Sequence, residues 1–378
     1  IADTPINTGT TIGTVTYTIT PQVSGCNGNP VNYVVTIFPT PTATASNITI
    51  CSGQSAVIAI NANPNNVSGT TFSWTAVPSA NVSGFSNGNG SLINQSLSLT
   101  DFNVGTVTYL ITPAANGCNG PVSTVTVTIN PLPTVDAGVD YQVCEPTTIP
   151  VSGTIGGAAT SGTWVVVTGA GSVSASTVSG NVVTAVYTVA PADIAGSIVL
   201  RLETNDPDLG GPCSLASDLL TIDINRRATV SVPADFAVCE PSNLLASPIN
   251  VSGTIGGSAT TGLWSVVSGA GSLAASTLSG SIVSTNYTID PADIGTTITL
   301  RLTTNDPDGP SGPCVEEYEE INITINQAAV ISAGIDLQLC RDIPSIVLQG
   351  AQSGASTGVV WSGGSGSFSN SSALQLSY

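Results

Sequence analysis

The stretch Val151-Ser-Gly-Thr-Ile-Gly-Gly157 returns one hundred residues later as Val251-Ser-Gly-Thr-Ile-Gly-Gly257. A repeat of about one hundred residues has the length of a whole domain, so the sequence predicts a tandem array in which each unit contacts mainly its neighbours. Three further pairs share the offset of 100: 169–172 with 269–272, 191–194 with 291–294, and 204–208 with 304–308.

The unit from 133 to 227 is predicted to be all-β. Its segments are rich in Val, Ile and Thr and are bounded by Gly, Pro, Asn and Ser, which is typical of sandwich strands. No segment keeps a helical period of 3.6 residues. The expected strands are 148–153, 162–167, 182–189, 197–202 and 218–225.

Each unit carries one tryptophan on its second strong strand: Trp74, Trp164, Trp264 and Trp361. We expect these rings in the core between two sheets, with a sugar-stacking surface position as the alternative. Arg201 alternates with apolar neighbours on its strand, so we expect it to face solvent or form a structural ion pair.

The repeat also sets the expected domain bounds. Gly13-Thr-Val-Thr-Tyr17 matches Gly105-Thr-Val-Thr-Tyr109, so residues 1–40 are expected to be the C-terminal half of a unit. The short linkers predict an extended, semi-rigid rod. The lack of any Met favours a mature or internal segment, and no apolar run reaches the ~20 residues of a membrane span. The expected units are 1–40 (half), 41–132, 133–227, 228–328 and 329–378 (the N-terminal half of a unit).

The charge balance excludes several classes of partner. Five Lys and Arg stand against 23 Asp and Glu, giving a net charge of −18. Nucleic acid and acidic membrane surfaces both require a basic patch, so neither is an expected partner. Only 7% of residues are charged, which leaves Thr, Ser, Asn and Gly to cover the surface and suits an extracellular protein.

Eight cysteines fall into two series with steps of 92 to 101 residues. Pairing within each unit predicts Cys51–Cys118, Cys144–Cys213 and Cys239–Cys314, closing loops of 67, 69 and 75 residues. Each bridge is expected to contribute about 3–4 kcal/mol. Spacing alone does not prove connectivity, and free thiols are the alternative. The first series is Cys51, Cys144, Cys239 and Cys340, and the second is Cys26, Cys118, Cys213 and Cys314.

The cysteine spacing indicates disulfides and an oxidising compartment rather than a metal site, because the chain has no CxxC pair and no His. Cys26 and Cys340 are left over. Whether they pair with another part of the chain or with another chain stays open.

Enzymatic activity is not expected. The chain has no His and no Lys, so Ser–His–Asp, Cys–His and Schiff-base mechanisms lack their key groups. Carboxylate pairs remain, but they recur in turns. The one constellation with ion chemistry is the pair of Asp-Pro-Asp loops, whose carboxylates suit calcium, with a solvated turn as the alternative. The candidate ligands are Asp206, Asp208, Asp306 and Asp308; no other cofactor is expected.

Several phrases resemble the Ig-like or PKD-like repeats of very large Bacteroidota surface proteins, including gliding-motility adhesins exported by type IX secretion. The resemblance implies an all-β tandem of sandwich domains at the outer cell surface and adhesion to polysaccharide or to another surface protein. No catalytic residues carry over from it. The phrases are Thr108–Pro113, Gly117–Gly120, Val125–Pro133, Asp136–Asp140 and Val143–Glu145.

The sequence therefore predicts the disulfide-locked stalk of a bacterial cell-surface adhesin, with further repeats of the same chain as neighbours. Three alternatives stay open: a glycan-binding module that gains avidity by repetition, an accessory region of a large secreted enzyme, and a subunit of a homopolymeric surface fibre or filament.

Overall fold

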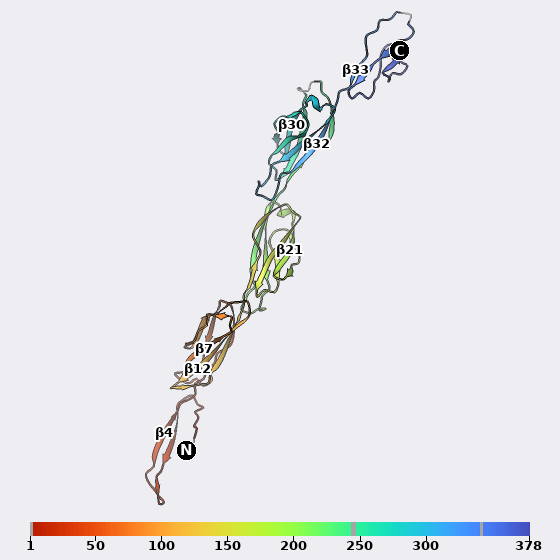
Figure 1. Ribbon diagram of the computed structural model, residues 1–378. Helices are drawn as coiled ribbons and strands as arrows, with labels where there is room; N and C mark the ends of the chain where they lie inside the picture. The colour runs from red at the N-terminus through yellow and green to blue at the C-terminus, as the bar shows by residue number, and fades with distance from the viewer. Residues whose placement is uncertain (1–2, 243–246, 341–342) are drawn as a thin grey trace. The chain divides into compact units, whose positions relative to one another are not determined.

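The computed structural model describes residues 3–242, 247–340 and 343–378 (Figure 1). Regular structure in these residues is strand throughout, apart from two three-residue 3-10 turns at Pro191–Asp193 and Pro291–Asp293. Backbone contacts divide the chain into two compact units. One unit comprises Ile1–Asp140, Thr147–Asp193 and Ser197–Ile222, and the other Tyr141–Pro146, Ile194–Gly196 and Asp223–Tyr378. The five segments expected from the sequence are a finer division, whose bounds stay a prediction.

The first unit opens with a two-stranded hairpin, in which β1 (Gly13–Ile19) pairs antiparallel with β4 (Val31–Ile37). A short pair at its tip joins β2 (Gln22–Val23) to β3 (Cys26–Asn27). Side chains that the repeat buries elsewhere are open in the hairpin. Tyr33 is 61% exposed, whereas its counterpart Val125 is completely buried.

A complete β-sandwich follows, here called the first module. Its larger sheet has the order β5-β14-β12-β7-β9, and short pairs β10-β6 and β11-β8 lie outside that sheet. Every second residue of β12 is buried, as expected for a strand with one face on the core. The strands are β5 (Ile48–Cys51), β6 (Ser55–Ala59), β7 (Thr71–Pro78), β8 (Val82–Ser83), β9 (Gly88–Asn89), β10 (Leu92–Ser96), β11 (Ser98–Leu99), β12 (Gly105–Ala115), β13 (Cys118–Asn119) and β14 (Ser123–Asn130).

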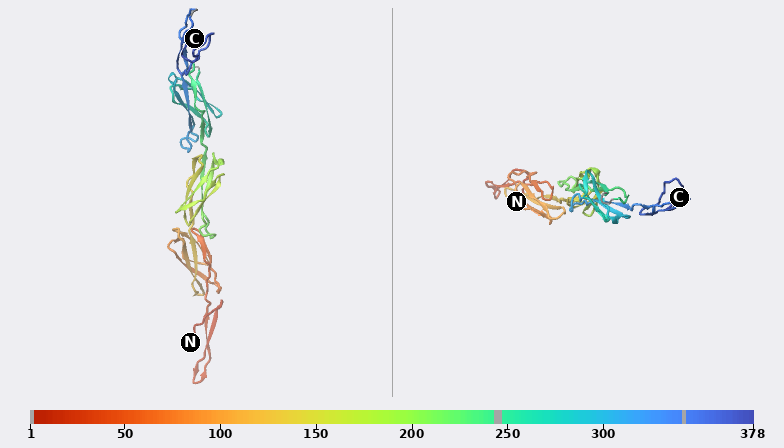
Figure 2. Two further views of the ribbon diagram at one scale, coloured as in Figure 1. Left: turned by 90° about the vertical axis from the view of Figure 1, so that its right-hand side faces the viewer. Right: turned by 90° about the horizontal axis from the view of Figure 1, so that it is seen from above.

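The second module repeats the two-layer plan with sheets β15-β17-β21-β19 and β16-β23-β22-β18 (Figure 2). All five strands expected from the sequence are confirmed. The strands are β15 (Pro133–Asp136), β16 (Tyr141–Cys144), β17 (Thr148–Gly157), β18 (Gly162–Thr168), β19 (Ser172–Val173), β20 (Thr177–Ser179), β21 (Val182–Thr188), β22 (Gly196–Thr204) and β23 (Ser217–Asn225).

The third module has the same strand order, β24-β26-β30-β28 and β25-β32-β31-β27. The strands are β24 (Ala228–Ser231), β25 (Phe236–Cys239), β26 (Ile249–Gly257), β27 (Gly262–Ser268), β28 (Ser272–Leu273), β29 (Thr277–Ser279), β30 (Ile282–Thr288), β31 (Thr297–Thr304) and β32 (Tyr318–Asn326). After it come β33 (Val330–Ser332) paired with β35 (Ala351–Ser353), and β34 (Val347–Gln349) paired with β36 (Gln375–Ser377).

The tryptophans take the predicted core positions in the three modules. Trp74, Trp164 and Trp264 are 7%, 2% and 4% exposed. The indole nitrogen of Trp164 donates to the Val183 carbonyl at 3.1 Å, which satisfies its polar atom inside the core. Trp361 is half-buried. The ion pair expected for Arg201 is also present, with Glu203 as its partner.

A buried carboxylate fixes the start of β22 in the second module. Asp193 is 5% exposed, and its Oδ2 accepts a 2.8 Å hydrogen bond from the Tyr187 hydroxyl. The backbone amides of Ala170, Gly171 and Ala190 donate to the same carboxylate at 2.6 to 3.1 Å. Burial alone would raise the pKa of Asp193, but these hydrogen bonds outweigh it and lower the pKa below its ordinary value.

The third module repeats this arrangement with Tyr287 and Asp293, whose hydroxyl and carboxylate are 2.7 Å apart. The amides of Ala270 and Gly271 again donate to the carboxylate. The repeated Pro-Ala-Asp phrase therefore supplies a buried carboxylate that holds its turn against a core tyrosine.

Candidate functional site

The disulfides join successive modules instead of locking each module internally. Cys51 of the first module bonds to Cys213 of the second, with Cα atoms 5.5 Å apart. Cys144 bonds to Cys314 of the third module, with Cα atoms 5.0 Å apart. The predicted pairings within units are therefore wrong.

The remaining four cysteines, Cys26, Cys118, Cys239 and Cys340, are free and exposed. Cys118 and Cys239 were predicted to be bonded, so their assignment as disulfide residues is also corrected. Each of the two bonds joins a first-series cysteine to a second-series cysteine of the following module.

The topology explains why the pairing within units fails. In the first module, β5 runs parallel to β14, and this register places Cys51 opposite Asn130 at the end of β14. Cys118 lies before the start of that strand. The eight residues of β14 span about 26 Å, whereas disulfide-bonded Cα atoms lie within about 7 Å. The two cysteines of one module therefore occupy opposite ends of it.

A polar contact accompanies the first disulfide. The side-chain amide of Asn130 donates to Asp208 Oδ2 at 3.2 Å. The backbone amide of Cys213 donates to the same oxygen at 3.1 Å. Asp208 therefore links the end of β14 in the first module to the cysteine loop of the second module, directly beside the Cys51–Cys213 bond.

The second joint has the same parts. Asn225, at the end of β23, donates to Asp308 Oδ2 at 2.7 Å, and the Cys314 amide donates to that oxygen at 3.2 Å. The hydrogen bond from Asn225 is the main cause of a lowered pKa for Asp308. The same two hydrogen bonds to one aspartate therefore accompany the disulfide at both joints, so this arrangement is a repeated feature of the chain. We call Asn205–Cys213 and Asn305–Cys314 the Asp-Pro-Asp loops.

The first aspartate of each loop, Asp206 or Asp306, has a different structural role from the second. Asp206 accepts hydrogen bonds from the amides of Asp208 and Gly210 at 3.2 and 3.0 Å. Asp306 accepts one from Gly309 at 3.0 Å. These short-range bonds shape the turn itself, which is a usual role of aspartate in loops.

The calcium prediction for these loops stays a prediction. One oxygen of Asp208 and one of Asp308 are buried without a hydrogen-bond partner, and these atoms are where a cation would bind. Within the part of the chain that the structure describes, one group of three candidate ligands lies close enough together: Cys51, Asp208 and Cys213. Its two sulfurs are bonded to each other, so they are not thiolate ligands.

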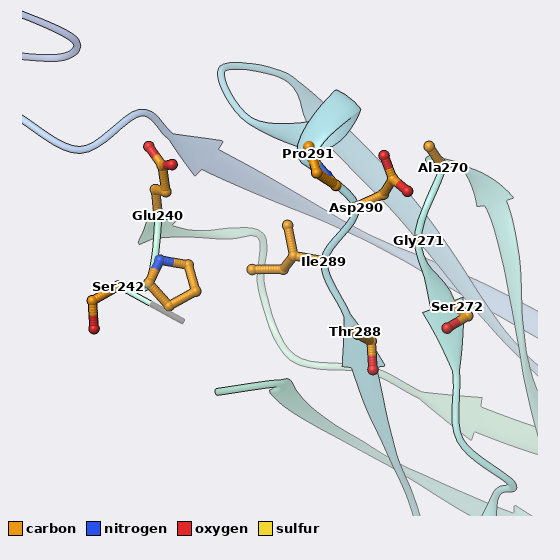
Figure 3. A pocket seen from close by; sticks show the side chains of 10 residues that line it. Glu240, Ser242, Ala270, Gly271, Ser272, Thr288, Ile289, Asp290 and Pro291 are labelled. Atoms are coloured by element: carbon orange, nitrogen blue, oxygen red, sulfur yellow. The ribbon is translucent and has the colours of Figure 1, made fainter. Parts of the chain in front are cut away.

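A hollow of about 680 Å³ lies in the third module beside Glu240, the residue that follows Cys239 in the sequence (Figure 3). Glu240 borders one side of it, and Gly271 and Asp290 border the other. None of the described residues that line it is aromatic, so it offers no ring on which a sugar could stack.

The asparagines at the joints were not predicted from the sequence. Asn130, Asn225 and Asn326 each end the last strand of a module. The sequence does show that each asparagine stands at the same place in the repeat, at the start of a linker. It does not show the aspartate in the next module to which Asn130 or Asn225 donates.

Comparison with known proteins supports the architecture. A family model described as a PKD-like domain matches residues 1–41 and 48–133. Sandwiches of this kind follow one another along the chain. The fold is a tandem array of Ig-like β-sandwiches. No curated protein matches the chain.

Solved structures that match the chain include three from other proteins. A variant of the titin immunoglobulin domains I67–I69 is 11% identical, with a TM-score of 0.40, over 76% of this chain and 99% of that one. The human desmocollin-1 ectodomain is 8% identical, with a TM-score of 0.29, over 96% and 79%. Sidekick-1 immunoglobulin domains 1–5 are 13% identical, with a TM-score of 0.30, over 85% and 69%. At these scores the likeness supports no further inference.

No helix in the described ranges is long and apolar enough to cross a membrane.

Proposed function

We propose that this tandem array is the stalk of a bacterial cell-surface adhesin, which holds a binding surface away from the cell and carries tension between the two. The observation that carries the proposal is the cross-module disulfide. A bond inside a module protects only that module, whereas Cys51–Cys213 and Cys144–Cys314 connect each module to the next.

Each joint has two covalent connections, the linker and the disulfide. In the first joint, Leu132 connects the modules through the backbone, and Cys51–Cys213 connects them a second time. Two attachment points resist rotation about either one. The hydrogen bond from Asn130 to Asp208 adds a third contact.

The two disulfide loops overlap in the sequence, and this overlap limits extension under load. Without disulfides, 263 residues separate Cys51 from Cys314, about 920 Å when fully extended at 3.5 Å per residue. With both bonds in place, the shortest covalent route crosses from Cys51 to Cys213, follows 69 residues back to Cys144, and crosses to Cys314. That route extends to about 240 Å.

The loops also stabilise the folded state. The bonds close loops of 162 and 170 residues. Chain-entropy arguments give about 5 kcal/mol for a loop of this length. This exceeds the contribution expected for loops inside one unit, and it couples the unfolding of neighbouring modules.

We propose that the protein lies outside the cell, on the surface of a Bacteroidota-type bacterium that exports it by type IX secretion. Disulfides are stable in oxidising compartments, which supports an extracellular site. A net charge of −18 with few charged side chains is compatible with this location. We propose a surface polysaccharide or another surface protein as the target of the adhesin that this stalk would carry.

Single-molecule pulling on the two chain ends tests the load-bearing role. We expect reductant to lengthen the fully extended segment between Cys51 and Cys314 from about 240 Å to about 920 Å. Replacing Cys51 by Ser leaves a 93-residue route through Cys144, so this variant should gain about 80 Å without reductant. The Cys118→Ser control should gain nothing. Equal extension with and without reductant would argue against the proposal.

A further inference from the structure

The third module carries the same Cys–Asn pair that the two joints use, but here the cysteine, Cys239, is a free thiol. The parallel register of β25 and β32 places Cys239 opposite Asn326. The same register places Cys51 opposite Asn130. The amide after the cysteine donates to the asparagine carbonyl in both, at 2.8 Å from Glu240 and 2.9 Å from Ser52.

The residue after the cysteine repeats as well. Glu145 accepts a 2.9 Å hydrogen bond from the Arg227 amide, and Glu240 accepts a 3.0 Å hydrogen bond from the Ala328 amide. Both contacts hold the start of the linker against the cysteine. Figure 3 shows Glu240 at this end of the module. The third module therefore repeats the backbone geometry of the bonded sites.

The Cys–Asn pairs at the two joints are less exposed than the pair Cys239 and Asn326. Cys51 is 2% exposed and Asn130 is half-buried, whereas Cys239 and Asn326 are both exposed. The difference matches the presence of Cys213 and Asp208 on the first pair. The described residues that follow Asn326 contain one cysteine, Cys340, which has the first-series position and no Asp-Pro-Asp loop before it.

We propose that Cys239 and Asn326 form a docking site for a third Asp-Pro-Asp loop, supplied by another module of the same long-loop type. The inference rests on the proposed function, because it adds a third joint of the same kind to the stalk. The partner is defined by its chemistry: an aspartate that accepts from Asn326, and a cysteine five or six residues later that bonds to Cys239. The spacing is that of Asp208 to Cys213 and of Asp308 to Cys314.

The loops of Cys26 and Cys118 do not meet this description. Cys118 follows Ala115-Asn-Gly117 in a tight turn, and no aspartate precedes it at the required spacing. A second copy of this chain therefore offers no free matching loop, because Cys213 and Cys314 are already bonded.

Bond formation at Cys239 is an oxidation. The two thiols lose two protons and two electrons as the S–S bond forms, and a small-molecule disulfide such as oxidised glutathione accepts them and becomes two thiols. No other bond changes.

An extended chain tests the proposal. Tyr378 matches Tyr287, because each hydroxyl accepts a hydrogen bond from a glycine amide, Gly366 at 2.7 Å and Gly271 at 2.9 Å. Residues 288–328 are therefore appended as a second copy after Tyr378, which supplies one complete Asp-Pro-Asp loop. The protein is refolded with oxidised and reduced glutathione, and its disulfides are mapped by mass spectrometry.

We expect the appended copy of Cys314 to bond to Cys239. A bond to Cys340, which would lie inside the new module, overturns the proposal. The Asn326→Ala variant of the extended chain should lower the yield of the Cys239 bond several-fold and leave Cys51–Cys213 intact. Trp361 fluorescence reports whether the appended segment folds.

A second measurement does not depend on that folding. A peptide with the sequence of Thr304–Glu317, its cysteine activated as a thiopyridyl disulfide, is added to the unextended chain. A thiolate attacks the peptide sulfur and releases thiopyridone. We expect capture at Cys239 to be about tenfold faster than at Cys26, Cys118 or Cys340, as one good polar contact predicts. Equal rates at all four, or no loss of selectivity with an Asp308→Ala peptide, which lacks the acceptor, contradict the proposal.

This test is separate from the test of the stalk. Pulling addresses the two closed joints, whereas the extended chain and the peptide address the open pair. Either result can fail without the other.

Discussion

Asn130 ends the last strand of the first module, and its side-chain amide donates a 3.2 Å hydrogen bond to Asp208 in the second. Because Asp208 also accepts from the Cys213 amide, one carboxylate sets both the contact between modules and the position of the bonded cysteine. A covalent bond and a polar contact therefore share one loop.

Replacing Asp208 by Ala should expose the first joint to reductant. The substitution removes the acceptor for Asn130 and for the Cys213 amide, so the loop opens more often. We expect dithiothreitol to reduce Cys51–Cys213 several-fold faster in this variant, while Cys144–Cys314 keeps its rate. Timed alkylation and mass spectrometry measure both. Asp308→Ala is the matched control and should show the reverse pattern.

Disulfide mapping tests the pairing directly. Peptides from the non-reduced protein should link Cys51 to Cys213 and Cys144 to Cys314. The Cys213→Ser variant should leave Cys51 as a free thiol, because its partner lies in another module. A Cys51–Cys118 peptide in the unaltered protein would contradict the structure.

The buried Tyr–Asp pairs should stabilise their own modules. Tyr187→Phe removes a hydroxyl that donates to Asp193 and accepts from the Gly171 amide. We expect a loss of about 1–3 kcal/mol in the free energy of unfolding. Calorimetry should show an effect of similar size for Tyr287→Phe. Tyr33→Phe, at a 61% exposed position, serves as the neutral control.

Acid should weaken the same modules. The pKa values of Asp193 and Asp293 are lowered in the folded protein, despite burial that acts to raise them, by hydrogen bonds to backbone amides and to tyrosine. A lowered folded pKa contributes stability that is fully present above the unfolded value, about 3.9, and is lost as pH falls through the folded value.

The melting temperature should therefore fall as pH drops below about 4. The Asp193→Asn variant should be less stable at neutral pH and show a smaller loss on acidification. A parallel acid response in the variant and the unaltered protein would assign the effect to other carboxylates.

Chelation tests calcium at the Asp-Pro-Asp loops. The oxygens of Asp206 and one oxygen of Asp208 accept hydrogen bonds from within the protein. The other oxygen of Asp208 has no hydrogen-bond partner. If calcium is bound there, EDTA should lower the melting temperature, and an unchanged melting temperature would contradict the calcium prediction. A site filled at 100 times its Kd would add about 2.7 kcal/mol, and its loss would lower the melting temperature by several degrees. Such a drop would establish the calcium site.

Local patterns in the sequence were sufficient to predict the all-β fold. Alternation along segments such as 182–189 predicted strands, because a strand with one face on a core must alternate. The single tryptophan of each unit predicted a core position, and Trp164 takes it. The repeat showed that the Pro-Ala-Asp phrase recurs, but only the tertiary structure showed that Asp193 is buried and hydrogen-bonded to Tyr187.

The sequence by itself determined the repeat, the all-β modules and the oxidising chemistry of regularly spaced cysteines. Only the tertiary structure decided which cysteines meet. The parallel pairing of β5 with β14 carries Cys51 to one end of its module, and about 26 Å of strand separates it from Cys118. Because a disulfide forms only between sulfurs brought within bonding distance, each of the four bonded cysteines has its partner in the neighbouring module.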